Sequence, residues 1–246
     1  MLVIVPASFH DKNLIKAFCK VVNFFGPYPA HELLTVSRPA DAQYSKKILD
    51  ALSGGFAKSS QHIFDENGPV GWPLGPNFYW HQTIQYLKKT NNSSSWLWME
   101  LDMTPIAENW LDVLNKEYID KGTDCLGTIQ RNKNATDYHF VGAGIYPADF
   151  YKKYTSWKSV LDSSVAFDVF CQHEIVPSAS NSSFIDHKFR TSYFKCTNEG
   201  LRGLSSDKSP EFSQPVRDDC VLVHGCVDSS LANLILNDHS YIFTAT

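Results

Sequence analysis

Short apolar runs alternate with helical stretches in the first half of this chain, and this order constrains the fold more than any other feature. The runs Leu2–Val5 and Leu33–Val36 are rich in β-branched and aliphatic residues, as expected for buried strands. Segments 11–23 and 43–52 between and after them carry apolar residues at helical spacing. Strand–helix alternation predicts an α/β fold, a three-layer sandwich with a mostly parallel central sheet.

The remaining segments extend the same pattern. We expect strands at His62–Asp65, Trp96–Met99, Cys125–Gln130, His139–Tyr146 and Val221–Val223, and a helix at Tyr79–Lys89. We expect irregular polar segments at Gly68–Pro76, Arg131–Asp137 and Thr197–Asp219, the last of these partly mobile. The sequence contains no internal repeat that would indicate a second unit of the same kind.

The bulk properties argue against several functional classes, without excluding DNA as a partner through a local basic patch. The net charge of −4 lacks the basic excess that proteins bound to duplex DNA usually carry. No segment approaches a membrane span, and the first residues lack the basic start of a secretory signal. The six cysteines are scattered without a C-x-x-C pair, which favours free thiols in a reducing cytoplasm. We therefore expect a cytoplasmic protein.

An apolar strand that runs directly into two acids is the strongest functional signal. Trp96–Met99 is followed by Glu100 and Asp102, whose side chains would share one face if the strand continued. Two adjacent carboxylates repel each other, and Mg²⁺ or Mn²⁺ bound between them would remove that cost. Thr104–Pro105 has the composition of a helix start, so we expect a helix at Ile106–Leu114. The alternative is a solvent-exposed acidic turn without a ligand.

Glu100-Leu101-Asp102 resembles the DXD motif of GT-A fold glycosyltransferases, which use a nucleotide-sugar donor, and the resemblance covers most of the chain. It implies that Asp102 ligates the metal directly, and that Glu100 acts on the donor ribose or through water. His224, in the late Val-His-Gly segment, would complete the metal shell. The His-Gly-Cys segment is similar to that of several phage-encoded enzymes of this type.

The resemblance also implies a donor site. The end of the first strand would touch the base and Arg38 would contact the nucleotide, while Gly142 and Ala143 would lie under the sugar, unless the glycine instead serves tight helix packing. The loop Gly71–Asn77 is rich in glycine and proline, and we expect it to be a donor-site loop. Trp72 could stack on a sugar or base, and Asn77 could cap the following helix. The expected donor-binding residues are Pro6, Ala7, Ser8, Arg38, Trp72, Asn77, Glu100, Leu101, Asp102, Gly142 and Ala143.

Two acids are candidates for the general base that an inverting transfer needs. Asp168 follows an apolar run and Glu174 lies six residues later, and each could instead be a surface charge or a helix cap. Lys188 and Arg190 lie in a run of mixed charge, where a solvated face is expected and a diphosphate contact is the alternative.

The resemblance implies one GT-A-like domain over residues 1–246, with a nucleotide-binding half at 1–105 and an acceptor half with the C-terminal metal segment at 106–246. The donor would be a nucleotide-diphosphate sugar, with UDP favoured. The acceptor hydroxyl is open and includes a modified base in DNA, a glycan or a protein. A nucleotidyltransferase or a non-catalytic nucleotide-binding protein remains an alternative, although the first strand lacks the Gly-rich basic loop usual in nucleotidyltransferases.

Overall fold

The structure, a computed structural model, describes residues 1–131, 138–193, 201–205, 213–238 and 241–242. Its centre is a seven-stranded sheet in the order β3-β2-β1-β4-β7-β6-β8. The pairs β1·β2, β1·β4, β2·β3 and β6·β8 are parallel, and β7 is antiparallel to both of its neighbours. The sheet is therefore mostly parallel, as predicted.

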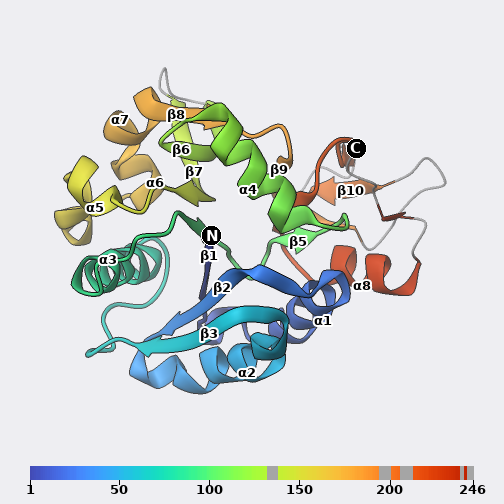
Figure 1. The fold of residues 1–246 in the computed structure, drawn as a ribbon, viewed down its shortest axis with the longest axis horizontal. Helices are drawn as coiled ribbons and strands as arrows, with labels where there is room; N and C mark the ends of the chain where they lie inside the picture. Colours follow the sequence, from blue (N-terminus) through green and yellow to red (C-terminus); the bar gives the residue numbers. More distant parts are fainter. Residues whose placement is uncertain (132–137, 194–200, 206–212, 239–240, 243–246) are drawn as a thin grey trace.

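The elements follow in strand–helix order along the first half of the chain (Figure 1). The central sheet consists of β1 (Leu2–Pro6), β2 (Tyr28–Ser37), β3 (Phe56–Ile63), β4 (Trp96–Trp98), β6 (Cys125–Arg131), β7 (Tyr138–Tyr146) and β8 (Ala179–Asn181). The helices are α1 (Ile15–Phe25), α2 (Ala42–Leu52), α3 (Leu74–Lys89), α4 (Trp110–Lys121), α5 (Phe150–Lys153), α6 (Phe167–Phe170), α7 (Gln172–Ile175) and α8 (Ser230–Asn237).

Both faces of the sheet are covered, which makes the three layers. Along β1, Val3 and Val5 pack into a core with α1, α2 and α4, whereas Leu2 and Ile4 pack into a second core with α3 and α5. Alternate residues of a strand point to opposite faces, so an unbroken apolar strand requires an apolar layer on each side. The second core is rich in aromatic rings, and Trp80 of α3 stacks on Phe167 at 4.2 Å.

A smaller sheet joins the last part of the chain to the centre of the molecule. It has the order β11-β10-β9-β12-β5. Its strands are β5 (Thr104–Pro105), β9 (Ile185–Ser192), β10 (Arg202–Ser205), β11 (Ser213–Pro215) and β12 (Leu222–Cys226). β5 pairs antiparallel with β12 directly after the turn that follows β4. This pairing brings the late part of the chain to the end of the central sheet.

Several predicted boundaries are wrong, and one predicted element is of the wrong type. Thr104–Pro105 is a strand, and α4 begins only at Trp110, after the left-handed residue Asn109. The pairing with β12 involves residues more than a hundred positions away, so local helix-start preferences could not reveal it. β3 begins six residues before the predicted strand and α3 five residues before the predicted helix. His224 lies inside β12 and does not follow it.

Other predictions fall partly outside the described residues. Within the polar segment Thr197–Asp219, residues 197–200 and 206–212 are not described, and of the loop Arg131–Asp137 only Arg131 is. Five of the six cysteines are free and buried, and Cys196 lies outside the described residues.

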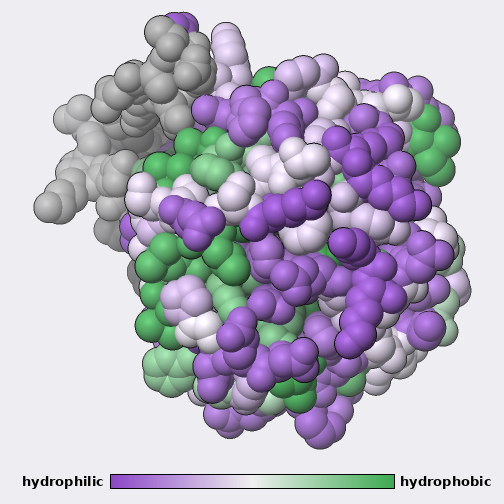
Figure 2. All heavy atoms as spheres, turned by 90° about the vertical axis from the view of Figure 1, so that its left-hand side faces the viewer, coloured by the Kyte–Doolittle hydropathy of each residue, from purple (hydrophilic) through white to green (hydrophobic). Residues whose placement is uncertain are grey.

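In the part of the chain that is described, we find no helix both long and apolar enough to cross a membrane. The face in Figure 2 is mostly hydrophilic, with smaller hydrophobic areas.

Candidate metal and nucleotide site

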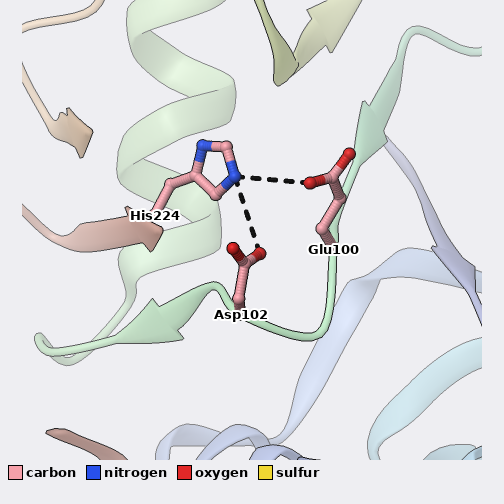
Figure 3. Close-up of side chains that lie close together, drawn as sticks. All are labelled: Glu100, Asp102 and His224. Atoms are coloured by element: carbon pink, nitrogen blue, oxygen red, sulfur yellow. Dashed lines mark ion pairs between the residues drawn. The ribbon is translucent and has the colours of Figure 1, made fainter. Parts of the chain in front are cut away.

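Three side chains from distant parts of the sequence converge where the central sheet ends. Glu100 and Asp102 lie on the turn after β4, and His224 reaches them from β12 (Figure 3). His224 Nε2 lies 3.3 Å from Glu100 Oε2 and 3.5 Å from Asp102 Oδ1. One ligand atom from each residue lies within 4.8 Å of the others. The predicted trio is therefore brought together, with both carboxylates on a turn and not on a strand.

The backbone around the trio explains its position. The amide of Met103 bonds the carbonyl of Glu100 at 3.0 Å, which closes the turn. The amide of Cys226 bonds the carbonyl of Asp102 at 3.1 Å, so the turn is tied directly to β12. Gly225 has φ +91° at an irregularity between His224 and Cys226. Only glycine adopts this conformation without strain, which gives the His-Gly pair a structural reason.

The charges of the trio are strongly coupled. Burial and the neighbouring charge of Glu100 raise the pKa of Asp102 to about 6, although His224 acts in the opposite direction. Burial alone would raise the pKa of Glu100, but the close approach of His224 and the indole of Trp98 (3.1 Å) lower it. Burial alone would lower the pKa of His224, but the two carboxylates raise it. A protonated His224 therefore offsets only part of the negative charge of the two carboxylates.

The trio fits a divalent cation. Asp102 Oδ1 is buried and has no hydrogen-bond partner within the described chain. Asp11 and Asp168 also act on this centre, because the charge of Glu100 raises the pKa of each of them, after burial as the larger cause. Four acids around one histidine leave an excess of negative charge that a cation would neutralise. Oxygen and imidazole donors suit Mn²⁺, and carboxylate oxygens suit Mg²⁺.

A cleft of about 620 Å³ opens beside the trio and is large enough for a nucleotide ligand. Seven of the predicted donor-binding residues line it: Pro6, Ser8, Arg38, Trp72, Glu100, Leu101 and Asp102. Trp72 is 78% exposed at the cleft, in a loop with a cis bond to Pro73. The ends of β1 and β2, the loop before α3 and the turn after β4 thus contribute to one surface.

A buried polar network holds the ends of β1 and β2 at the cleft. Arg38 pairs with Asp41 at 2.5 Å and donates to the carbonyl of Pro69 at 3.1 Å. The hydroxyl of Tyr79 on α3 contacts Asp41 at 2.9 Å and the carbonyl of Ala7 at 2.8 Å. Because Asp41 already neutralises the Arg38 guanidinium, Arg38 supplies less charge to a ligand than a free arginine would.

Four predicted donor-binding residues are not among those that line the cleft. Ala7 is buried and bonds through its backbone, and Ala143 packs in the first core. The buried amide of Asn77 donates to the carbonyls of Val160 and Val165, so it holds a neighbouring loop and makes no helix cap. A Cβ on Gly142 would lie 2.4 Å from the ring of Phe167, which indicates tight helix packing. All four residues are buried.

The two candidate bases differ clearly in their surroundings. Both carboxylate oxygens of Glu174 accept hydrogen bonds, from the backbone and hydroxyl groups of Thr155 and Ser156 at 2.7–2.9 Å. These bonds outweigh burial and lower the pKa of Glu174 to about 2. Asp168 is the second residue of α6, next to the cleft residue Phe167, and its pKa is raised by burial. Glu174 thus has the surroundings of a structural acid, whereas the pKa of Asp168 responds to the charge of Glu100.

Gly71, Gly75 and Pro76 line the cleft together with Trp72, in the segment expected to be a donor-site loop. Sequence reasoning missed nine other residues that line it: His10, Asp11, Leu14, Val70, Tyr79, Trp98, Phe167, Cys226 and Val227. Arg190 also lines it, although a solvated face was expected there, whereas Lys188 pairs with Asp186 at 2.7 Å. His187 was also missed, and its Nδ1 lies 2.8 Å from Nδ1 of His224. No strand was predicted at β9; had one been, side-chain alternation would have placed His187 and Lys188 on opposite faces.

No protein-family model matches this sequence, and no curated protein matches it either. Solved structures do match in fold. The galactosyltransferase LgtC, crystallised with donor and acceptor sugar analogues, matches with a TM-score of 0.52 at 13% identity, over 92% of this chain and 87% of that one. Mouse xyloside xylosyltransferase 1 matches with a TM-score of 0.52 at 11% identity, over 91% of this chain and 96% of that one. The chain therefore has the GT-A fold of these glycosyltransferases.

Proposed function

We propose that this protein is a metal-dependent glycosyltransferase that moves a sugar from a nucleotide-diphosphate sugar to an acceptor hydroxyl. One observation supports this most: Glu100, Asp102 and His224 converge beside a cleft of about 620 Å³ in a fold that resembles LgtC. The two halves of the chain, 1–105 and 106–246, would act as one domain because each contributes to the trio. UDP is the nucleotide that we favour.

The residues of the cleft suggest how the donor would lie. We place the base toward Pro6 and Ser8 at the end of β1, and the diphosphate at the trio. Bound Mn²⁺ or Mg²⁺ would neutralise charge that develops on the departing diphosphate. Arg190 is exposed and has no ion pair among the described residues, so its guanidinium is free to bind a phosphate oxygen. The aromatic side chains of Phe167 and Trp72 would then contact the sugar or the acceptor.

Asp168 is our candidate base for an inverting transfer. Its raised pKa, caused mainly by burial, makes it a better proton acceptor than an ordinary aspartate. It would remove the proton of the acceptor hydroxyl while that oxygen attacks the anomeric carbon. We leave Glu174 out of this role because Thr155 and Ser156 already occupy both of its carboxylate oxygens.

The test is nucleotide release from a panel of UDP-hexoses and UDP-pentoses, without acceptor. Many glycosyltransferases hydrolyse their donor slowly, so we expect UDP and free sugar, at a rate that EDTA suppresses and Mn²⁺ restores. Pyrophosphate as the product from a nucleoside triphosphate would identify a nucleotidyltransferase instead. Binding of UDP-sugars without any turnover, including with acceptors, would identify a binding protein and overturn the proposal.

The acceptor requires a separate screen. The similarity to phage-encoded enzymes makes duplex DNA with hydroxymethylated bases one acceptor to test, beside glycans and peptides. The net charge of −4 predicts that any DNA contact depends on a local patch. Sugar transfer to DNA should then weaken steeply as salt rises.

A further inference from the structure

His187 lies behind the metal-facing histidine, on the neighbouring strand. β9 and β12 run parallel, and His187 stands opposite His224 in their register. The two rings lie 4.6 Å apart between centroids, with an interplanar angle of 55°. Their Nδ1 atoms are 2.8 Å apart, which is a hydrogen-bond distance. His224 therefore presents Nε2 to Glu100 and Asp102, and Nδ1 to His187.

The contact between the two Nδ1 atoms holds a single proton. Two protonated Nδ1 atoms would place two hydrogens in the same 2.8 Å gap, and two unprotonated ones would place two lone pairs there. A neutral imidazole carries its proton on one nitrogen only. If Nδ1 of His224 carries the proton, Nε2 of the same ring must therefore have a free lone pair. The direction of the hydrogen bond decides whether Nε2 of His224 has a lone pair to offer.

We infer that His187 is a positioning residue: it accepts a hydrogen bond from Nδ1–H of His224 and thereby directs the Nε2 lone pair of His224 toward the metal. This rests on the proposed function, because it assumes that Glu100, Asp102 and His224 hold a cation. Histidines that bind metals generally donate their other ring N–H to an acceptor, which fixes both tautomer and ring orientation. Here the acceptor is the imidazole nitrogen of His187.

The backbone fixes this arrangement independently of the metal. A Cβ on Gly225 would lie 1.7 Å from the carbonyl oxygen of Lys188, so β12 and β9 approach each other closely just after the histidine pair. The irregular register between His224 and Cys226 begins at the same point. The strands thus hold the two rings together before any ligand arrives, which is the condition for pre-organised metal binding.

The first experiment measures Mn²⁺ affinity from the electron paramagnetic resonance signal of free Mn²⁺. We compare the wild type with His224→Ala, His187→Ala, His187→Asn and the exposed control His173→Ala. We expect His187→Ala to weaken Mn²⁺ binding about 10- to 100-fold. His187→Asn keeps a carbonyl acceptor and should recover most of that loss, and His173→Ala should match the wild type.

The second experiment needs no substitution at His187. Long-range ¹⁵N–¹H spectra of the Mg²⁺-loaded wild type report the tautomer of each histidine, and His224→Asn identifies the signals of His224. We expect the proton of His224 on Nδ1. Two results would overturn the inference and leave the metal site in place. One is a proton on Nε2 of His224, and the other is an Mn²⁺ affinity of His187→Ala equal to that of the wild type. Absence of Mn²⁺ binding in the wild type would overturn the metal role itself.

Discussion

Replacement of Glu174 by glutamine should destabilise the protein without reducing turnover. In the native state its carboxylate accepts four hydrogen bonds from Thr155 and Ser156. These lower its pKa from an ordinary 4.5 to about 2. Each pKa unit corresponds to about 1.36 kcal/mol, so the ceiling is about 3.4 kcal/mol. The carboxyl is partly exposed and glutamine keeps one acceptor oxygen, so we expect a loss of about 1–2 kcal/mol.

The dependence on pH distinguishes this loss from a packing defect. The folded pKa lies below the unfolded pKa, so the charged carboxylate stabilises the fold fully above about pH 5. That contribution is lost as the pH falls from about 4.5 toward about 2. The difference in unfolding free energy between wild type and Glu174→Gln should therefore be largest at pH 7 and should shrink on acidification.

Urea unfolding at pH 7, 4.5 and 3, with Glu108→Gln as the control, gives the measurement. Glu108 is exposed and has no side-chain hydrogen bond or ion pair with another described residue, so its replacement should change stability by no more than about 0.5 kcal/mol. The reasoning is refuted if Glu174→Gln is as stable as the wild type at pH 7. A fall in kcat with unchanged stability would instead return Glu174 to the list of candidate bases.

Three further substitutions test the site. Gly225→Ala forces a Cβ onto Lys188 at φ +91°, so it should cost about 2–4 kcal/mol in urea unfolding and weaken Mn²⁺ binding by displacing His224. Asp168→Asn should lower kcat about 10²- to 10⁴-fold with little change in the donor KM, and unchanged kcat in steady-state assays would exclude it as the base. Arg190→Ala should raise the donor KM about tenfold, as expected for a charged hydrogen bond, and Arg190→Lys should recover part of this.

Local patterns were sufficient to predict the central sheet. The apolar runs at β1, β2 and β4 need burial on both faces, and the helices between them have one apolar side. A parallel sheet with a layer of helices on each face is almost the only arrangement that buries the strands and the apolar sides of the helices together. The wrong element, Thr104–Pro105, depends on pairing with β12. Sequence-local preferences carry no information about such a distant partner, and here the pairing outweighed them.

The candidate site also combines residues that local sequence patterns can indicate with residues that only tertiary contacts bring there. Glu100 and Asp102 could be found because an apolar strand runs into them, and His224 through the resemblance to a known arrangement. His187 and Arg190 lie on β9, which belongs to the smaller sheet and is brought to the site by its pairing with β12. Asp11 lies in the short helical turn that β1 leads into. Their positions at the site result from tertiary contacts that no spacing in the sequence indicates.

The most direct test of the central claim is calorimetric titration of UDP with and without Mn²⁺, on the wild type and on Asp102→Asn. Asp65→Asn makes the same chemical change on an exposed acid that is not among the cleft-lining residues. We predict that Mn²⁺ strengthens UDP binding at least about tenfold, a change of about 1.4 kcal/mol, in the wild type and in Asp65→Asn, and that Asp102→Asn loses this dependence. Equal UDP affinity with and without Mn²⁺ in the wild type, or a metal dependence that survives Asp102→Asn, would contradict the account.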